Sequence, residues 1–207
     1  MLEIKNATLS MAGRQLFMGK SLRVDDGEVA CITGESGCGK TSLLRAILGF
    51  VSLDEGHISI DGELLTPASA GEFRKFMAYV PQDLALPSET VGEMVGLTFA
   101  LKANAATPFS KERLMHEWRM LDLDEELYDK KVSELSGGQR QRIIISTLGL
   151  LKKPIVLADE PTSALDTHTA GLVLAYLKAL AANGATVLTV SHDPAFANGC
   201  DKRIAIP

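Results

Sequence analysis

The stretch Gly34-Glu35-Ser36-Gly37-Cys38-Gly39-Lys40-Thr41 has the spacing G-x-x-x-x-G-K-T, which can bind phosphate groups. Glycines in such a loop let successive backbone N–H groups point at phosphate oxygens, and the N-terminus of a following helix favours an anion. Lys40 can then reach the outer phosphates, and the Thr41 hydroxyl can coordinate Mg²⁺. An apolar run precedes the loop, and apolar residues at helical spacing follow it. This context predicts a nucleoside triphosphate site.

A second candidate for chemistry is the pair Asp159-Glu160, which follows a continuous apolar run at residues 155–158. Such a run is typical of a strand buried on both faces of a parallel sheet, and ligands of open α/β sheets bind at the carboxyl ends of the strands. One carboxylate there can hold Mg²⁺, and a second can polarise an attacking water. Alone, the pair could be a strand-end turn before Pro161. With the phosphate loop upstream, it predicts phosphoryl transfer.

The composition narrows the class of protein. The 207 residues suffice for one large domain, and we expect a single domain over residues 1–207. The net charge of −5 and the pI near 5.4 argue against a non-specific nucleic-acid binder. Cys31, Cys38 and Cys200 show no paired or metal-ligand spacing, which indicates a reduced, cytosolic protein. No apolar run reaches the roughly 18 residues that a membrane span needs, so any membrane role would come through a partner.

Alternating and continuous apolar runs predict β structure on both sides of the phosphate loop. Strands are expected at residues 2–9, 22–24, 29–32, 56–65 (a hairpin), 77–80, 155–158, 185–190 and 204–206. Helices are expected directly after the phosphate loop, after Gly137-Gly138 as far as about residue 151, and over about 167–183. Lys152 and Lys153 would favour the C-terminal end of the second of these helices. The order of elements predicts an α/β fold that begins with β structure.

Residues 83 to about 134 differ in character from the rest of the chain, because strand signals vanish and helical spacing takes over. Ser110 is a good N-cap for one of the helices, and Trp118 is expected in their core rather than in a ligand site. The segment therefore predicts a mostly helical insertion.

The whole chain resembles the ATP-binding cassette (ABC) ATPases, with their motifs in the same order. Residues 34–41 resemble the Walker A motif and residues 155–160 the Walker B motif, and Gln82 stands at the position of the Q-loop glutamine. The signature motif is matched by Leu135-Ser136-Gly137-Gly138-Gln139, the D-loop by Ser163-Ala164-Leu165-Asp166, and the switch histidine by His192. The resemblance implies a P-loop NTPase core with an N-terminal antiparallel β subdomain and a helical subdomain at about 83–138, between Q-loop and signature.

The resemblance also assigns roles, with ATP and Mg²⁺ as cofactors. Glu160 would be the general base, and Gln82 and His192 would complete the catalytic set. The metal ligands would be Thr41, Gln82 and Asp159. The nucleotide-binding set would be Gly34, Glu35, Ser36, Gly37, Cys38, Gly39, Lys40, Thr41, Ser42 and Met11. Ser136, Gly137, Gly138 and Gln139 would act in trans on the ATP of a second copy, next to Asp166 of the D-loop.

One position departs from the family pattern. The family usually carries an aromatic residue near the end of the first strand, where it stacks on adenine, and the alignment puts Met11 there. Phe17 is the nearest aromatic but comes several residues late. We therefore expect a methionine thioether rather than an aromatic ring against the base.

The resemblance implies an ATP-hydrolysing subunit of an ABC transporter on the cytoplasmic face of the cell membrane. Its partners would be a second copy or a related ATPase subunit and an integral membrane permease, with no nucleic acid. With so few residues after His192, no added regulatory domain is expected. The alternative is a soluble ABC ATPase without a transport role, of the cofactor-assembly type.

Overall fold

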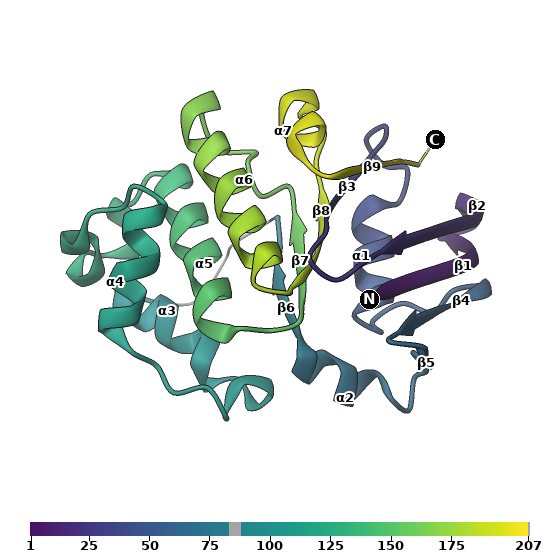
Figure 1. Cartoon of the computed structure of the whole chain (residues 1–207), viewed down its shortest axis with the longest axis horizontal. Coiled ribbons are helices and arrows are strands. Elements are labelled where there is room, and N and C mark those ends of the chain that lie inside the picture. Colours follow the sequence, from purple (N-terminus) through teal and green to yellow (C-terminus); the bar gives the residue numbers. More distant parts are fainter. Residues whose placement is uncertain (83–87, 207) are drawn as a thin grey trace.

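A five-stranded parallel sheet with strand order β6-β7-β8-β3-β9 forms the centre of the molecule (Figure 1). The computed structural model describes residues 1–82 and 88–206. The strands are β3 (Val29–Thr33), β6 (Met77–Val80), β7 (Ile155–Asp159), β8 (Thr186–Val190) and β9 (Lys202–Ala205). Every residue of β7 and β8 is buried, as expected for parallel strands covered on both faces. The predicted buried strands are confirmed.

Alternate residues of the sheet point into two separate hydrophobic cores. Val156 and Val187 face the first core, which the helices beyond one face of the sheet complete. These helices are α5 (Gly137–Leu151), α6 (Thr167–Ala182) and α7 (Pro194–Gly199). Leu157 and Leu188 face the second core, which includes the apolar side of α1 (Lys40–Ile47). The sheet is therefore held rigidly from both sides.

A four-stranded antiparallel sheet with strand order β2-β1-β4-β5 shares the second core. Its strands are β1 (Leu2–Met11), β2 (Arg14–Val24), β4 (Glu55–Ile60) and β5 (Glu63–Leu64). A turn at Gly13 joins the paired strands β1 and β2, and the predicted hairpin at 56–65 is confirmed, since β4 pairs with β5. In Figure 1 this sheet lies on the opposite side of the parallel sheet from α4 and α5.

The segment between β6 and α5 is helical where the structure describes it, from residue 88 on. It holds the helices α3 (Val91–Ala100) and α4 (Lys111–Met120) and 3₁₀ turns at Lys102–Asn104, Glu125–Asp129 and Val132–Glu134. Before β6, the chain forms the short helix α2 (Ala70–Phe73) and a 3₁₀ turn at Arg74–Phe76. Ser110 caps α4 by accepting a hydrogen bond from Arg113 N at 3.2 Å, as predicted. Trp118 is fully buried, which confirms its place in the core. Residues 83–87, where this segment was expected to begin, lie outside the described residues.

The prediction for Lys153 is wrong. Its ammonium donates to the carbonyls of Lys75 and Ala103, at 2.6 and 2.8 Å, instead of facing the end of α5. The reason is the left-handed backbone of Lys152 (φ 48°), which ends the helix and turns the following residue away.

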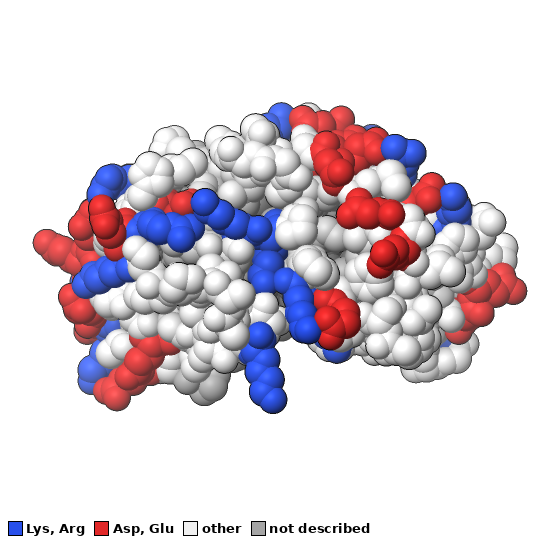
Figure 2. Space-filling model, turned by 60° about the horizontal axis from the view of Figure 1, so that its bottom comes forward, with Lys and Arg blue, Asp and Glu red and all other residues white. Residues whose placement is uncertain are grey.

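Charged side chains of both signs are interspersed on the face shown in Figure 2, where basic groups run in an irregular band beside acidic ones. No helix of the described residues is both long enough and apolar enough to cross a membrane.

Candidate nucleotide site

A cleft of about 660 Å³ opens at the carboxyl edge of the parallel sheet. It is lined by Met11, Leu16, Ser36, Gly37, Gly39, Lys40, Thr41, Ser42, Gln82, Asp159, Glu160, Val190 and His192. These residues come from distant parts of the chain and meet because β7, β8 and β3 are neighbours in the sheet, so their carboxyl ends lie side by side. The cleft therefore brings together the phosphate loop, the two carboxylates, Gln82 and His192, which are candidate site residues of the sequence.

The phosphate loop is shaped by glycines with left-handed backbone, at Gly37 (φ 79°) and Gly39 (φ 100°), a conformation that other residues rarely adopt. Directly after the loop, Lys40 begins α1 and folds back over it. Its ammonium donates to the carbonyl oxygens of Gly34 and Glu35, both at 2.8 Å. These are neutral acceptors, and an anionic phosphate oxygen would be the stronger partner for the same charge.

Three loop residues of the predicted nucleotide-binding set do not line the cleft. A Cβ on Gly34 would lie 2.1 Å from the carbonyl oxygen of Ile206, so close packing requires glycine there. Cys38 is buried, with its sulfur 4.0 Å from the Lys40 ammonium. Glu35 uses its backbone carbonyl to hold Lys40. Any contact of Gly34 or Cys38 with a nucleotide would therefore come from the backbone.

Asp159 is a buried carboxylate, 1% exposed, at the end of β7. Burial raises its pKa above the usual range, and the neighbouring negative charge of Glu160 adds to this, while the positive charges of Arg45 and Lys40 act in the opposite direction. Neither carboxylate oxygen has a hydrogen-bond partner within the described part of the chain. An orphaned buried carboxylate beside a hydroxyl fits Mg²⁺, which is bound through one or two carboxylates with phosphates and water completing its shell.

Replacing the Asp159 carboxylate should stabilise the nucleotide-free protein. In Asp159→Asn we expect the free energy of unfolding at pH 7 to rise by roughly 1–3 kcal/mol, because an unsatisfied buried charge is removed. The raised pKa means that the folded state binds the proton more tightly than the unfolded state, so stability falls as pH rises through the folded pKa. The difference between variant and wild type should vanish below about pH 4, where both states are protonated. Urea unfolding at several pH values measures this, and a variant less stable at pH 7 contradicts it.

Glu160 and His192 form the second polar cluster of the cleft. The Glu160 carboxylate lies 2.8 Å from Nδ1 of His192 and also accepts the His192 backbone N–H at 3.3 Å. A carboxylate only accepts, so the imidazole proton is on Nδ1 and Nε2 faces away from Glu160. Glu160 has a left-handed backbone (φ 49°), and its N–H donates to the Val190 carbonyl at 2.9 Å. The strained backbone at the strand end thus aims this carboxylate toward β8.

Gln141 is a positioning residue that sequence reasoning missed. It is buried on α5, and its amide donates to the Glu160 carbonyl at 2.8 Å while its oxygen accepts from Ala164 N at 3.3 Å. It therefore ties the backbone of the candidate base to the D-loop. The signal in the sequence that could have identified Gln141 was a polar residue on a helix whose neighbouring positions, such as Ile143 and Ile144, are buried and apolar.

Met11 lies at the edge of the cleft, where the alignment placed it, and its sulfur accepts from the Ser42 hydroxyl at 3.2 Å. Leu16 lines the same edge. Phe17 is buried in the second core, so its ring is not presented to the cleft. Gln82 lines the cleft and is exposed.

The signature residues lie outside the cleft, at the N-terminus of α5. Ser136 and Gln139 form a reciprocal capping box, with each side chain accepting the other's backbone N–H at 3.1 and 3.0 Å. A Cβ on Gly138 would lie 3.0 Å from the Ala164 carbonyl, so the glycine allows close packing on the D-loop. Asp166 ends that loop and caps α6 through Thr169 N at 2.9 Å.

Fold and cleft together define a P-loop nucleotide-binding protein of the α/β class. The family described as ABC transporter matches residues 17–163, which is most of the chain. The chain belongs to this family.

Relatives and solved structures agree with that membership. The chain is 35% identical, over 99% of its length, to an Fe(3+) ions import ATP-binding protein FbpC of Mesorhizobium japonicum, but covers 57% of that protein. It is 34% identical to a spermidine/putrescine import ATP-binding protein PotA of Pasteurella multocida, covering 99% of this chain and 55% of the relative. A bacterial ABC transporter cassette solved as a dimer matches the whole chain with a TM-score of 0.85 at 30% identity, over 94% of that cassette. The chain thus spans a little over half the length of these two curated relatives.

Proposed function

We propose that this chain binds and hydrolyses Mg-ATP as the nucleotide-binding subunit of an ABC transporter. The observation that carries the proposal is the cleft itself, which gathers Lys40, Asp159, Glu160 and His192. These are the cation, metal ligand, candidate base and switch histidine that phosphoryl transfer uses, and its catalysis is mostly positioning and charge stabilisation.

The main polar residues of the cleft each have a role in this proposal. Lys40 and the loop N–H groups bind the outer phosphates, while Thr41, Gln82 and Asp159 hold Mg²⁺, which neutralises phosphate charge when bound. Glu160 orients the attacking water and accepts its proton. His192 contacts the terminal phosphate and, through its bond to Glu160, keeps that carboxylate in place.

The position of the signature motif supports a dimer. Ser136, Gly137 and Gly138 lie outside the chain's own cleft, so we infer that they cap the ATP of a second copy, with Asp166 at the same interface. A solved cassette of similar fold is described as a dimer. The proposal further includes an integral membrane permease as partner, which would hold the subunit at the cytoplasmic face of the membrane.

Phosphate release from Mg-ATP tests the proposal directly. The purified chain should release phosphate only with Mg²⁺, and Ser136→Arg should abolish this release while ATP still binds, because a bulky cation blocks only the cap on the partner's nucleotide. Ser52→Arg, at an exposed site near β4, is the matched control. A chain that releases no phosphate, or a Ser136→Arg variant as active as the control, overturns the hydrolytic dimer. Fractionation of cells that express this chain and its permease separates the two roles. A transporter subunit should be recovered with the membranes, and a soluble ATPase should not.

Met11 should set base selectivity. Stacking of a base on an aromatic ring contributes roughly 1–3 kcal/mol in nucleic-acid binders, and a thioether offers less flat contact. We expect the wild type to bind ATP and GTP with similar affinity, and Met11→Tyr to bind ATP several-fold more tightly with unchanged turnover. Calorimetry with both nucleotides decides it. A strong ATP preference in wild type, unchanged by Met11→Tyr, would show that another residue contacts the base.

A further inference from the structure

A second cavity lies at the opposite edge of the parallel sheet from the nucleotide cleft. It has a volume of about 590 Å³. Its lining residues are His116, Glu117, Met120, Leu148, Gly149, Lys152, Lys153, Pro154, Val156, Tyr176, Ala179, Leu180, Asn183, Gly184 and Ala185. Pro154 and Ala185 directly precede β7 and β8, whereas the residues of the nucleotide cleft follow these strands. The volume lies within the range of small-molecule sites.

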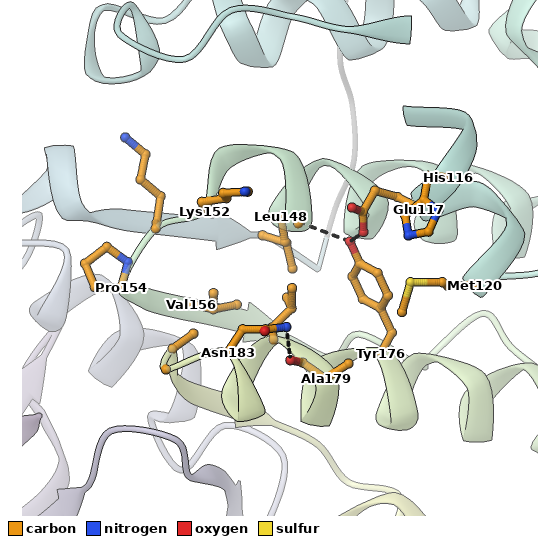
Figure 3. A pocket seen from close by; sticks show the side chains of 15 residues that line it. His116, Glu117, Met120, Leu148, Lys152, Pro154, Val156, Tyr176, Ala179 and Asn183 are labelled. Atoms are coloured by element: carbon orange, nitrogen blue, oxygen red, sulfur yellow. Dashed lines mark hydrogen bonds between the residues drawn. The ribbon is translucent and has the colours of Figure 1, made fainter. Parts of the chain in front are cut away.

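Apolar side chains line part of this cavity, and charged or polar side chains line the rest, among them His116, Lys152 and Asn183. Figure 3 shows Leu148, Val156 and Met120 around the space, with Glu117 and Tyr176 meeting at one side of it. The Tyr176 hydroxyl donates to the Glu117 carboxylate at 2.7 Å and accepts the backbone N–H of Gly149 at 3.1 Å. Helices α4, α5 and α6 are thus joined by one hydrogen-bonded cluster at the cavity.

Gly149 makes this cluster possible. A Cβ at this position would lie 2.3 Å from a Glu117 carboxylate oxygen and 2.4 Å from the Tyr176 hydroxyl. The packing therefore places the carboxylate directly against the backbone of α5. Burial next to this negative charge raises the pKa of Tyr176, so the phenol stays protonated and keeps donating to Glu117.

The charge of Glu117 has no counterion in the described part of the chain, since none of the ion pairs there includes it. The C-terminal ends of α5 and α6 lie at the same cavity, through Leu148, Gly149 and Ala179, and helix C-termini carry partial negative charge. Lys153 directs its ammonium to the carbonyls of Lys75 and Ala103. Glu117 is therefore the one carboxylate among the residues that line the cavity, together with apolar side chains such as Leu148 and Val156 and the basic side chains of His116 and Lys152.

We propose that this cavity binds a small organic amine, with its ammonium on the Glu117 carboxylate and its apolar body against Leu148, Val156 and Leu180. The half-buried carboxylate keeps one oxygen engaged by Tyr176 and can accept from an ammonium in addition, because a carboxylate has several acceptor positions. The site lies apart from the nucleotide cleft, so the inference is independent of the function proposed above.

Three probes with the same apolar body and different charge test the class of ligand. These are 4-phenylbutylamine, 4-phenylbutanol and 4-phenylbutyrate, titrated into the full chain with amide NMR shifts as the readout. The amine should shift the amides of Gly149, Asn183 and Gly184 and bind about 5-fold more tightly than the alcohol, as a partly exposed ion pair provides. The butyrate should bind most weakly. Absence of shifts with the amine, or equal affinity for amine and alcohol, overturns the proposal.

Variants test whether the Glu117 carboxylate binds the ammonium. In Glu117→Gln the side chain still accepts from Tyr176, so the fold is retained while the 5-fold preference for the amine should disappear. Glu112→Gln, on the exposed side of α4, is the matched control and should keep that preference. Ala179→Phe fills the cavity without touching the anchor and should remove binding of all three probes. A 5-fold preference for the amine that survives Glu117→Gln, or amine binding that survives Ala179→Phe, contradicts the site.

Discussion

Glu160→Gln should bind Mg-ATP and yet release phosphate about 10²- to 10⁴-fold more slowly than wild type, the range that a general base contributes. Glutamine keeps the size of the side chain and its acceptor for the Nδ1–H of His192, which lies 2.8 Å from the carboxylate in the wild type. The backbone bonds of Glu160 to Val190 and Gln141 do not involve the side chain. The substitution therefore removes the charge and the base while the geometry persists.

Single-turnover phosphate release measures the effect, with binding of a fluorescent ATP analogue as the second readout. Glu112→Gln, far from the cleft on α4, should match wild type in both. Residual turnover within a few-fold of wild type would show that Glu160 is not the base. Loss of nucleotide binding together with turnover would show instead a structural role for this carboxylate.

Lys40→Met should weaken binding of ATP by about 10- to 100-fold, since hydrogen bonds to charged groups contribute roughly 1.5–3 kcal/mol. Lys40 is only 9% exposed, and methionine replaces most of its buried stem while removing the ammonium. The loss should be much smaller for adenosine, which lacks phosphates. Calorimetry with ATP, ADP and adenosine measures this gradient.

Lys102→Met, at an exposed position of a 3₁₀ turn, is the control for a lost surface charge and should leave all three affinities unchanged. If Lys40→Met weakens ATP and adenosine to the same degree, the ammonium acts on the loop carbonyls of Gly34 and Glu35 rather than on phosphate.

Local sequence was enough to predict the structure where a short stretch determines its own geometry. The phosphate loop, the Ser110 cap and the hairpin at 56–65 depend on residue types within a few positions, and the structure has each of them where it was expected. The buried strands were equally readable, because a parallel sheet covered on both faces requires continuous apolar runs.

The features that could not be predicted from the sequence depend on contacts between distant segments. The bond between Glu160 and His192 exists because β7 pairs with β8. Gln141 reaches Glu160 only once α5 packs beside the end of β7. The Glu117–Tyr176 bond needs a glycine on a third helix, and no spacing in the chain relates these positions. Lys153 was misplaced for the same reason, since its acceptors Lys75 and Ala103 come from other parts of the fold.

We expect ATP to join two copies of this chain through their signature residues. Sedimentation velocity of Glu160→Gln, which holds ATP without consuming it, tests this most directly. Without nucleotide the protein should sediment as a monomer of 22.2 kDa, and with Mg-ATP at twice that mass, because a ligand bound by the dimer alone favours the dimer. Adding Ser136→Arg to the same protein should restore the monomer. A mass that is identical with and without Mg-ATP would show that ATP does not join two copies of the chain.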